Sequence, residues 1–159
     1  MDETKDEYQE ARDYALKLLS VYLRTERELC MKLREKGFSE KVSEELIKEL
    51  KEEEYIDDKQ YIAEYIQHQV KNRPCGKFLL IQKLLKKGLD KELIDEILPD
   101  FFDEARELKC ARIAAERKIP TIHKSSKNKQ GAALASFLSS RGFSGSVIRE
   151  ILEEEGFID

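Results

Sequence analysis

The residues that could support catalysis are scattered along this sequence and do not occur at the spacings of known reactive sites. There is no glycine-rich phosphate loop, no His-Glu-x-x-His zinc motif and no sharp turn carrying a nucleophilic serine. His68 and His123 are isolated from each other and from the cysteines, which favours surface or partly buried histidines over metal ligands. The sequence therefore predicts a non-enzymatic protein without a metal or cofactor.

Groups of acidic residues stand where helices are expected to begin or end. They occupy positions 52–54, 57–58 and 153–155. Solvated charge and helix N-capping explain them without a catalytic role. The three cysteines, Cys30, Cys75 and Cys110, show no zinc or redox spacing and are expected to be buried thiols in a reducing compartment. With no signal peptide and no apolar run long enough to span a bilayer, we expect a cytoplasmic protein.

The basic residues are better functional candidates, because charge is unevenly distributed along the chain. The net charge is −4, which argues against a general nucleic-acid coat. Residues 1–57 carry 11 Lys/Arg and 17 Asp/Glu, whereas residues 58–101 carry 8 and 7 and residues 102–159 carry 10 and 9. The first third is thus acidic and the rest slightly basic.

Two sets of bases are the predicted binding surface. The first comprises Lys71, Arg73, Lys77, Lys83, Lys86, Lys87 and Arg141; the second comprises Arg106, Lys109, Arg112, Arg117, Lys118, Lys124, Lys127 and Lys129. We interpret them as contacts to a polyanion or an acidic partner, the alternative being a solvated face with some lysines favoured by helix dipoles. Helical spacing places the first three bases of the second set on about one face. No aromatic platform interleaves the bases of this second set, so phosphate contact is favoured over base stacking.

The composition that must position these bases favours helices. Apolar residues make up 40% and charged residues 39%, with only 7 Gly and 3 Pro. So many charges suit an elongated molecule with small cores. We therefore expect an all-α fold.

A repeated apolar pattern organises these helices around Gly37, Gly88 and Gly142. The residues eight and four before and five and nine after each glycine are always apolar: Leu29, Leu33, Val42 and Leu46; Leu80, Leu84, Leu93 and Ile97; Leu134, Leu138, Val147 and Ile151. The spacing of about 50 residues is typical of a three-helix unit. The sequence predicts three tandem three-helix repeats in an elongated, curved array that gains stability from packing between neighbours.

Local signals give the boundaries of the repeats. We assign residues 1–10 to a frayed acidic lead-in and residues 11–57, 58–101 and 102–159 to repeats one to three. Thr25 and Glu28 form a predicted capping box, Ser39 and Asp57 or Asp58 are predicted N-caps, and Gly37 a C-cap.

Two prolines and a polar stretch are predicted to interrupt the helices of the later repeats. Pro99 and Pro120 are expected to end helices. Residues 121–131 are expected to form the longest loop and a candidate binding segment.

Three segments resemble the RecX family of regulatory proteins, which modulate the RecA recombinase. They are residues 15–39 (ALKLLSVYLRTERELCMKLREKGFS), 55–94 (YIDDKQYIAEYIQHQVKNRPCGKFLLIQKLLKKGLDKELI) and 137–152 (FLSSRGFSGSVIREIL). The resemblance implies three helical repeats that lodge in the groove of the RecA–single-stranded-DNA filament. It also implies suppression of ATP hydrolysis, strand exchange and coprotease activity.

The sequence departs from many RecX proteins in the first helix of repeat two, which carries Gln67, His68 and Gln69 in place of arginines. We therefore expect a monomeric RecA regulator with at most weak contact to single- or double-stranded DNA. Two alternatives remain: a non-specific single-stranded-DNA-binding protein that acts by competition, and an unrelated acidic helical adaptor.

Overall fold

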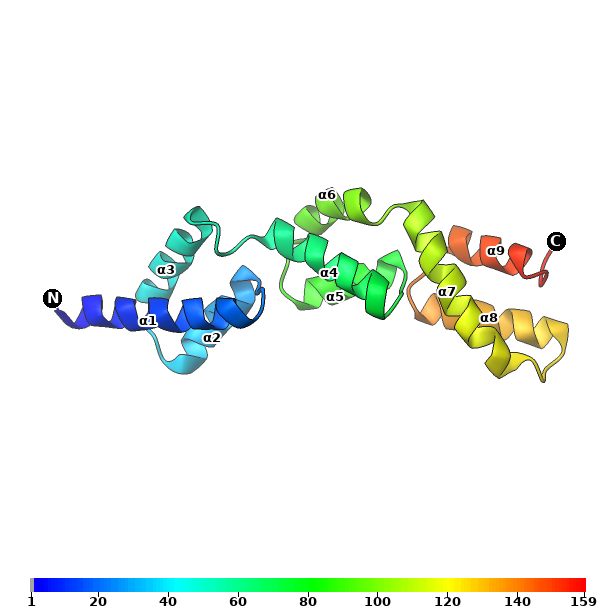
Figure 1. Cartoon of the computed structure of the whole chain (residues 1–159), viewed down its shortest axis with the longest axis horizontal. Coiled ribbons are helices and arrows are strands. Elements are labelled where there is room, and N and C mark those ends of the chain that lie inside the picture. The colour runs from blue at the N-terminus through cyan, green and yellow to red at the C-terminus, as the bar shows by residue number, and fades with distance from the viewer. Residues whose placement is uncertain (1) are drawn as a thin grey trace.

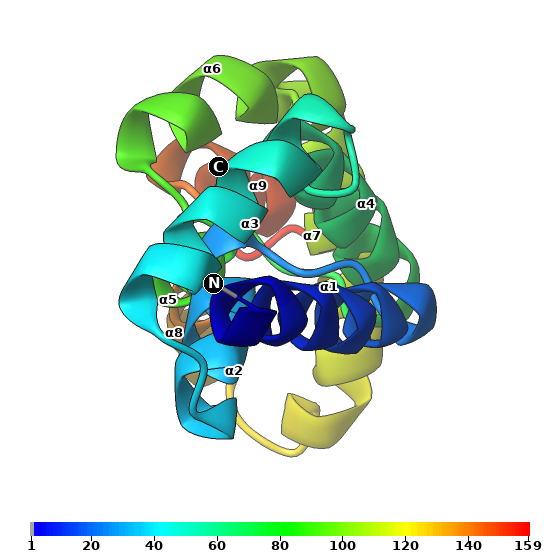
Figure 2. The same ribbon diagram turned by 90° about the vertical axis from the view of Figure 1, so that its left-hand side faces the viewer.

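The computed structural model describes residues 2–159, with the backbone alone for Asp2, as nine α-helices without a strand. The helices lie in groups of three along an elongated molecule with the two termini at opposite ends (Figure 1). They are α1 (Asp2–Val21), α2 (Glu26–Lys36) and α3 (Glu40–Glu52); α4 (Asp58–Asn72), α5 (Lys77–Lys86) and α6 (Lys91–Phe101); and α7 (Glu104–Ile122), α8 (Lys127–Ser140) and α9 (Gly145–Glu154). Seen along the long axis, the groups are turned relative to one another, so that α1 and α4 run in different directions (Figure 2). The predicted all-α fold of three tandem three-helix repeats is confirmed.

Side-chain caps begin the helices where the sequence predicts. The Thr25 hydroxyl accepts from the Glu28 amide at 3.1 Å, and Ser39 Oγ accepts from the Val42 amide at 3.4 Å. Gly37 ends α2 with φ +98°, a conformation that glycine adopts without strain. The second half of the predicted capping box is wrong, because the Glu28 carboxylate pairs with Lys87 Nζ at 3.4 Å instead of returning to Thr25.

The repeated apolar pattern corresponds to the core, with one shift. Ten of the twelve predicted positions are buried, but Leu93 and Ile97 in α6 are only partly so. Their neighbours Ile94 and Leu98 are buried in their place. Helix α6 packs mainly on α4, and less on α5 than α3 does on α2, so a different stripe of α6 faces inward.

Three of the predicted interruptions are wrong. Pro99 lies inside α6 and Pro120 inside α7, and each helix continues past its proline. Both prolines stand in the last turn, where few later amides depend on an unbroken hydrogen-bond ladder. The loop expected at residues 121–131 therefore shrinks to residues 123–126.

The acidic lead-in is also helical. From Asp2 onward, residues 2–10 form the first half of α1, and only Met1 lies outside the described residues. Glu7 holds this half in place, because its carboxylate accepts from the Ser39 amide at 2.6 Å and the Ser39 hydroxyl at 3.2 Å. We retain residues 11–57, 58–101 and 102–159 as the proposed extents of the repeats.

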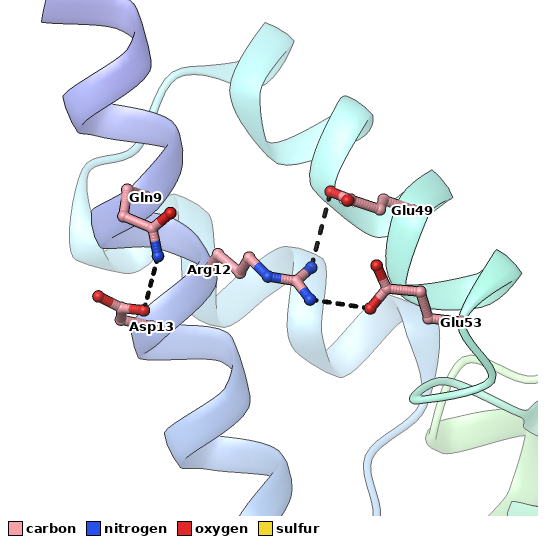
Figure 3. Close-up of polar contacts among 5 residues, drawn as sticks. All are labelled: Gln9, Arg12, Asp13, Glu49 and Glu53. Atoms are coloured by element: carbon pink, nitrogen blue, oxygen red, sulfur yellow. Dashed lines mark hydrogen bonds and ion pairs between the residues drawn. The ribbon is translucent and has the colours of Figure 1, made fainter.

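Arg12 ties the middle of α1 to the end of α3. Its guanidinium reaches between Glu49, at 3.6 Å, and Glu53, at 2.8 Å (Figure 3). The hydrogen bond to Glu53 raises the pKa of Arg12. The contact orients α1 across the repeat.

The apolar side chains form two cores. One core belongs to repeat one, from Ala11 to Ile56. The other runs continuously through repeats two and three, from Tyr61 to Leu152. Repeats two and three therefore share buried apolar surface, as expected for small units that cannot bury enough alone.

The second helices of the three repeats, α2, α5 and α8, follow one another end to end. Thr25, before α2, donates its hydroxyl to the Lys87 carbonyl after α5 at 2.9 Å. The Gly76 amide, before α5, donates to the Arg141 carbonyl after α8 at 2.9 Å. The amino end of each second helix thus meets the carboxyl end of the next, a favourable arrangement of helix dipoles.

Glu107 is the centre of the joint between repeats two and three. It is 4% exposed, and its carboxylate accepts from the Lys77 amide at 3.1 Å, the Ser144 amide at 3.0 Å and the Ser144 hydroxyl at 3.2 Å. These amides lie at the starts of α5 and α9. One buried carboxylate on α7 therefore accepts an otherwise unpaired amide from the start of each of two helices.

The joint between repeats one and two uses similar groups. The Glu26 amide, which begins α2, donates to Asp58 Oδ1 at 3.2 Å. Burial raises the pKa of Asp58. Thr25 is fully buried here, and Gly88 packs directly against Arg27.

No helix within residues 2–159 is long and apolar enough to cross a membrane.

Candidate interaction surface

The bases predicted in repeat two divide into free and engaged residues. Lys71, Arg73, Lys77 and Lys86 are exposed and form no ion pair within residues 2–159. Lys83 is partly buried, and its ammonium donates to Gln69 Oε1 at 3.2 Å. Lys87 pairs with Glu28 across the joint between repeats one and two. Lys83 and Lys87 therefore have structural roles that the spacing did not reveal.

Arg141 also belongs to a joint. Its guanidinium donates to the Pro74 carbonyl at 3.1 Å, and its own carbonyl accepts from Gly76. Both contacts bridge repeats two and three. The structure thus removes Arg141 from the freely accessible bases.

The second predicted set is divided in the same way. Lys109, Arg117, Lys124, Lys127 and Lys129 are exposed, without an ion pair among the described residues. The other three bases, Arg106, Arg112 and Lys118, contact the protein itself.

Arg112 makes the strongest of these internal contacts. It forms two hydrogen bonds to Glu154 of α9, at 3.0 and 2.6 Å, and they lower the pKa of that carboxyl. Arg106 donates to the Phe101 carbonyl, and Lys118 Nζ lies 5.1 Å from the centre of the Phe137 ring. Of the three bases that helical spacing places on about one face of α7, Arg112 is thus engaged with α9 and Arg106 with Phe101, while Lys109 has no ion pair in the described chain.

Two exposed apolar side chains accompany the free bases on α5. Phe78 is 55% and Leu85 39% exposed, and their seven-residue separation places them on the same side of the helix. Lys77 Nζ lies 5.6 Å from the centre of the Phe78 ring. We call Lys77, Phe78, Leu85 and Lys86 the α5 surface. The sequence reasoning missed its aromatic ring, although neither apolar residue fits the buried repeat pattern.

A cleft lies next to the joint between repeats two and three. The main cleft lies among α5, α6, α7 and α9, and its polar lining includes Asp95, Asp103, Glu104 and Ser146. Neither a histidine nor a cysteine lines it. Within residues 2–159, no three His, Cys, Asp or Glu side chains are grouped to hold a metal ion. Exposed bases and apolar side chains suit binding to another macromolecule better than chemistry on a small substrate.

The cysteines lead to a prediction on thiol reactivity. Cys75 and Cys110 are buried, and burial raises the pKa of both thiols, that of Cys110 to about 11. Cys30 is only partly buried. We expect alkylation at mildly alkaline pH to modify Cys30 first and the other two only as fast as repeats two and three unfold. Peptide mass spectrometry with and without urea measures this order, and rapid native labelling of Cys75 would contradict the packing described.

Comparison with known proteins matches all three repeats to domains of one protein family. Residues 11–50, 57–98 and 104–152 match the models of the first, second and third three-helix domains of RecX. The regulatory protein RecX of Clostridium acetobutylicum is 34% identical over 153 residues, which cover 94% of this chain and 71% of that protein. RecX of Chlorobium phaeobacteroides is 31% identical, with 97% of each chain covered.

Two solved RecX structures have the same fold as this chain. The crystal structure of RecX from Lactobacillus salivarius superposes with a TM-score of 0.89 at 26% identity, over 97% of this chain and 99% of that one. A second RecX crystal structure gives a TM-score of 0.85 at 27% identity, over 94% and 73% of the two chains. The match thus extends through all three repeats in sequence and in structure, and the chain belongs to the RecX family of regulatory proteins.

Proposed function

We propose that this protein binds the RecA filament on single-stranded DNA and lowers its ATPase, strand-exchange and coprotease activities. Membership of the regulatory family provides the partner, and the free bases of repeats two and three provide a surface for it. The elongated row of repeats suits contact with more than one filament subunit (Figure 1). Such a partner places the protein in the cytoplasm.

The observation that carries the proposal is the distribution of unpaired charge. Exposed bases without a carboxylate partner among the described side chains extend from the end of α4 through the α5 surface to α7 and the start of α8. Repeat one is acidic, and the whole chain has a net charge of −4. A charge of this sign disfavours strong binding to naked DNA and favours a contact that also requires RecA.

Inhibition of the DNA-dependent ATPase of RecA tests the proposal. We expect substoichiometric protein to lower the steady-state rate of ATP hydrolysis on single-stranded DNA. An unchanged rate with excess protein at low salt would refute the proposed activity. Binding to naked single-stranded DNA, measured in parallel over a salt series, identifies competition for DNA, because that mechanism requires tight binding without RecA that falls steeply with salt.

A charge-reversal variant tests the surface. Lys71→Glu, Arg73→Glu and Lys86→Glu together alter three exposed bases without an ion pair in the described chain, so folding should be preserved. We expect at least about a tenfold loss of filament affinity, or about 1.4 kcal/mol. A matched control, Lys17→Glu, Lys41→Glu and Lys48→Glu, changes the charge equally on the exposed surface of repeat one. Equal losses in the two variants would mean that only net charge matters, and undiminished inhibition by the first would place the contact elsewhere.

A further inference from the structure

The two joints inside the chain follow one rule. A carboxylate from the first helix of one repeat accepts the amide that begins the second helix of the preceding repeat. Asp58 accepts from Glu26 at 3.2 Å, and Glu107 accepts from Lys77 at 3.1 Å. Glu26 and Lys77 are the first residues of α2 and α5. The same pair of groups therefore joins both neighbouring pairs of repeats.

In each joint, the glycine that follows the second helix of the later repeat also contacts the earlier repeat. A Cβ atom on Gly88 would lie 2.1 Å from Arg27 Cδ, and one on Gly142 would lie 2.3 Å from the Leu79 amide nitrogen. Each glycine is thus in close contact with the preceding repeat. Thr25 and Gly76 bind the carbonyl groups of the residues just before these glycines.

Each joint thus has a receiving half, which is the carboxylate and the glycine of the later repeat, and a donating half, which is the start of the second helix of the earlier repeat. The amino-terminal end of the array presents a receiving half, in Glu7 and Gly37, that no other repeat of the described chain occupies. Glu7 lies 14 residues before the end of α1 (7 to 21), as Asp58 does in α4 (58 to 72), and Glu107 lies 15 before the end of α7 (107 to 122). Glu7 also binds Ser39 through the amide and hydroxyl, as Glu107 binds Ser144. Gly37 has φ +98°, as befits the glycine of a joint, but a Cβ atom there would meet nothing within 4 Å.

The other end presents an unused copy of the donating half. Residues 123–126 connect α7 to α8 with four residues, the length of the connections 22–25 and 73–76. Ser126 is exposed and caps α8 without a side-chain hydrogen bond. Within residues 2–159, no carboxylate accepts from the Lys127 amide, the counterpart of the Glu26 and Lys77 amides. This end therefore presents to solvent the groups that are bonded inside the array.

The two ends also carry opposite charge. Residues 1–57 have a net charge of −6, whereas residues 117–130 contain five bases, Arg117, Lys118, Lys124, Lys127 and Lys129, and no acid. We propose that a second copy of this chain docks head to tail, with Lys127 of one copy against Glu7 of the next and Ser126 beside Lys36 and Gly37. Such a contact is heterologous and continues the internal repeat, so it forms open chains of molecules. It adds a concentration-dependent state to the monomer expected from the sequence.

Two variants each disable one end without disturbing the fold. Gly37→Asn fills the open space at the receiving end, because asparagine tolerates a positive φ better than other side chains. Lys127→Glu with Lys129→Glu reverses the charge at the donating end, and acidic residues are favourable in the first turn of a helix. Gly156→Asn is the matched control for Gly37→Asn, since Gly156 has φ +72° and open space but follows α9 in repeat three, not the receiving end in repeat one.

Sedimentation equilibrium of the purified chain alone tests the proposal independently of RecA. The weight-average mass of the wild type and of Gly156→Asn should rise above 18.6 kDa as the concentration approaches about 1 mM. Each end variant should remain at 18.6 kDa. An equimolar mixture of the two end variants should form a dimer of twice that mass, because one intact joint remains. A wild type that stays monomeric, an end variant that associates like the wild type, or a mixture that stays monomeric would each overturn the proposal.

Discussion

Alanine in place of Gly76 should destabilise repeats two and three by about 3 kcal/mol or more. A Cβ atom at Gly76 would lie 2.2 Å from the Phe143 amide nitrogen and 2.3 Å from the Gly142 carbonyl oxygen. These are backbone atoms, which cannot rotate away as a side chain can. Separating the segments would also weaken the bonds from Gly76 to Arg141, at 2.9 Å, and from Phe78 to Gly142, at 3.0 Å. Urea unfolding followed by circular dichroism measures the loss.

Gly145→Ala is the matched control for this prediction. Gly145 begins α9, and a Cβ atom there would meet nothing within 4 Å. Alanine should therefore leave stability unchanged or raise it by up to about 1 kcal/mol through helix propensity. A Gly76→Ala protein as stable as Gly145→Ala would show that the two repeats do not approach as closely as described.

Glu107→Ala should cost about 3 kcal/mol, because it removes a buried carboxylate that accepts from the first amides of two helices. The carboxylate accepts from the Lys77 and Ser144 amides and from the Ser144 hydroxyl. Without it, the first turns of α5 and α9 should open more often than the core. Hydrogen exchange should therefore accelerate at the amides of Lys77 and Ser144 before it accelerates at Leu84 or Leu138.

Two comparisons separate the lost hydrogen bonds from the general effect of substitution on α7. Glu107→Gln retains a side-chain oxygen that can accept from both amides, so it should recover much of the stability. Glu116→Ala removes an exposed carboxylate from the same helix and should change stability by no more than about 0.5 kcal/mol. A Glu107→Ala protein that behaves like Glu116→Ala would contradict the role assigned to this joint.

Much of the fold could be predicted from the sequence because its signals are local. Leucines one turn apart, such as Leu29 and Leu33, mark the buried stripe of α2, and the cap at Thr25 marks where that helix begins. The two prolines led to wrong helix ends, because a proline does not stop a helix at every position. Pro99 and Pro120 remove hydrogen bonds only from final helical turns, so each helix continues to its end two residues later.

The candidate surface was less predictable than the fold. The local sequence does not distinguish Lys87 and Arg112 from Lys86 and Lys109. Lys87 is nevertheless paired with Glu28 and Arg112 with Glu154. A charge is free or engaged according to residues far away in sequence. Phe78 was not predicted to be part of the surface, because only bases were considered as candidates and Phe78 lies outside the buried repeat pattern.

The sequence by itself determined the helices, their grouping in threes and the buried stripes, because these follow from spacing, caps and turns within a few residues. Glu107 marks the boundary of that reasoning. It stands three residues before Cys110 and four before Ala111, so helical spacing places it on a buried stripe. Only the tertiary structure shows why a charge is stable there, since its partners Lys77 and Ser144 lie 30 and 37 residues away. The joints between repeats, the bases that remain free and the open groups at the two ends were likewise decided by packing.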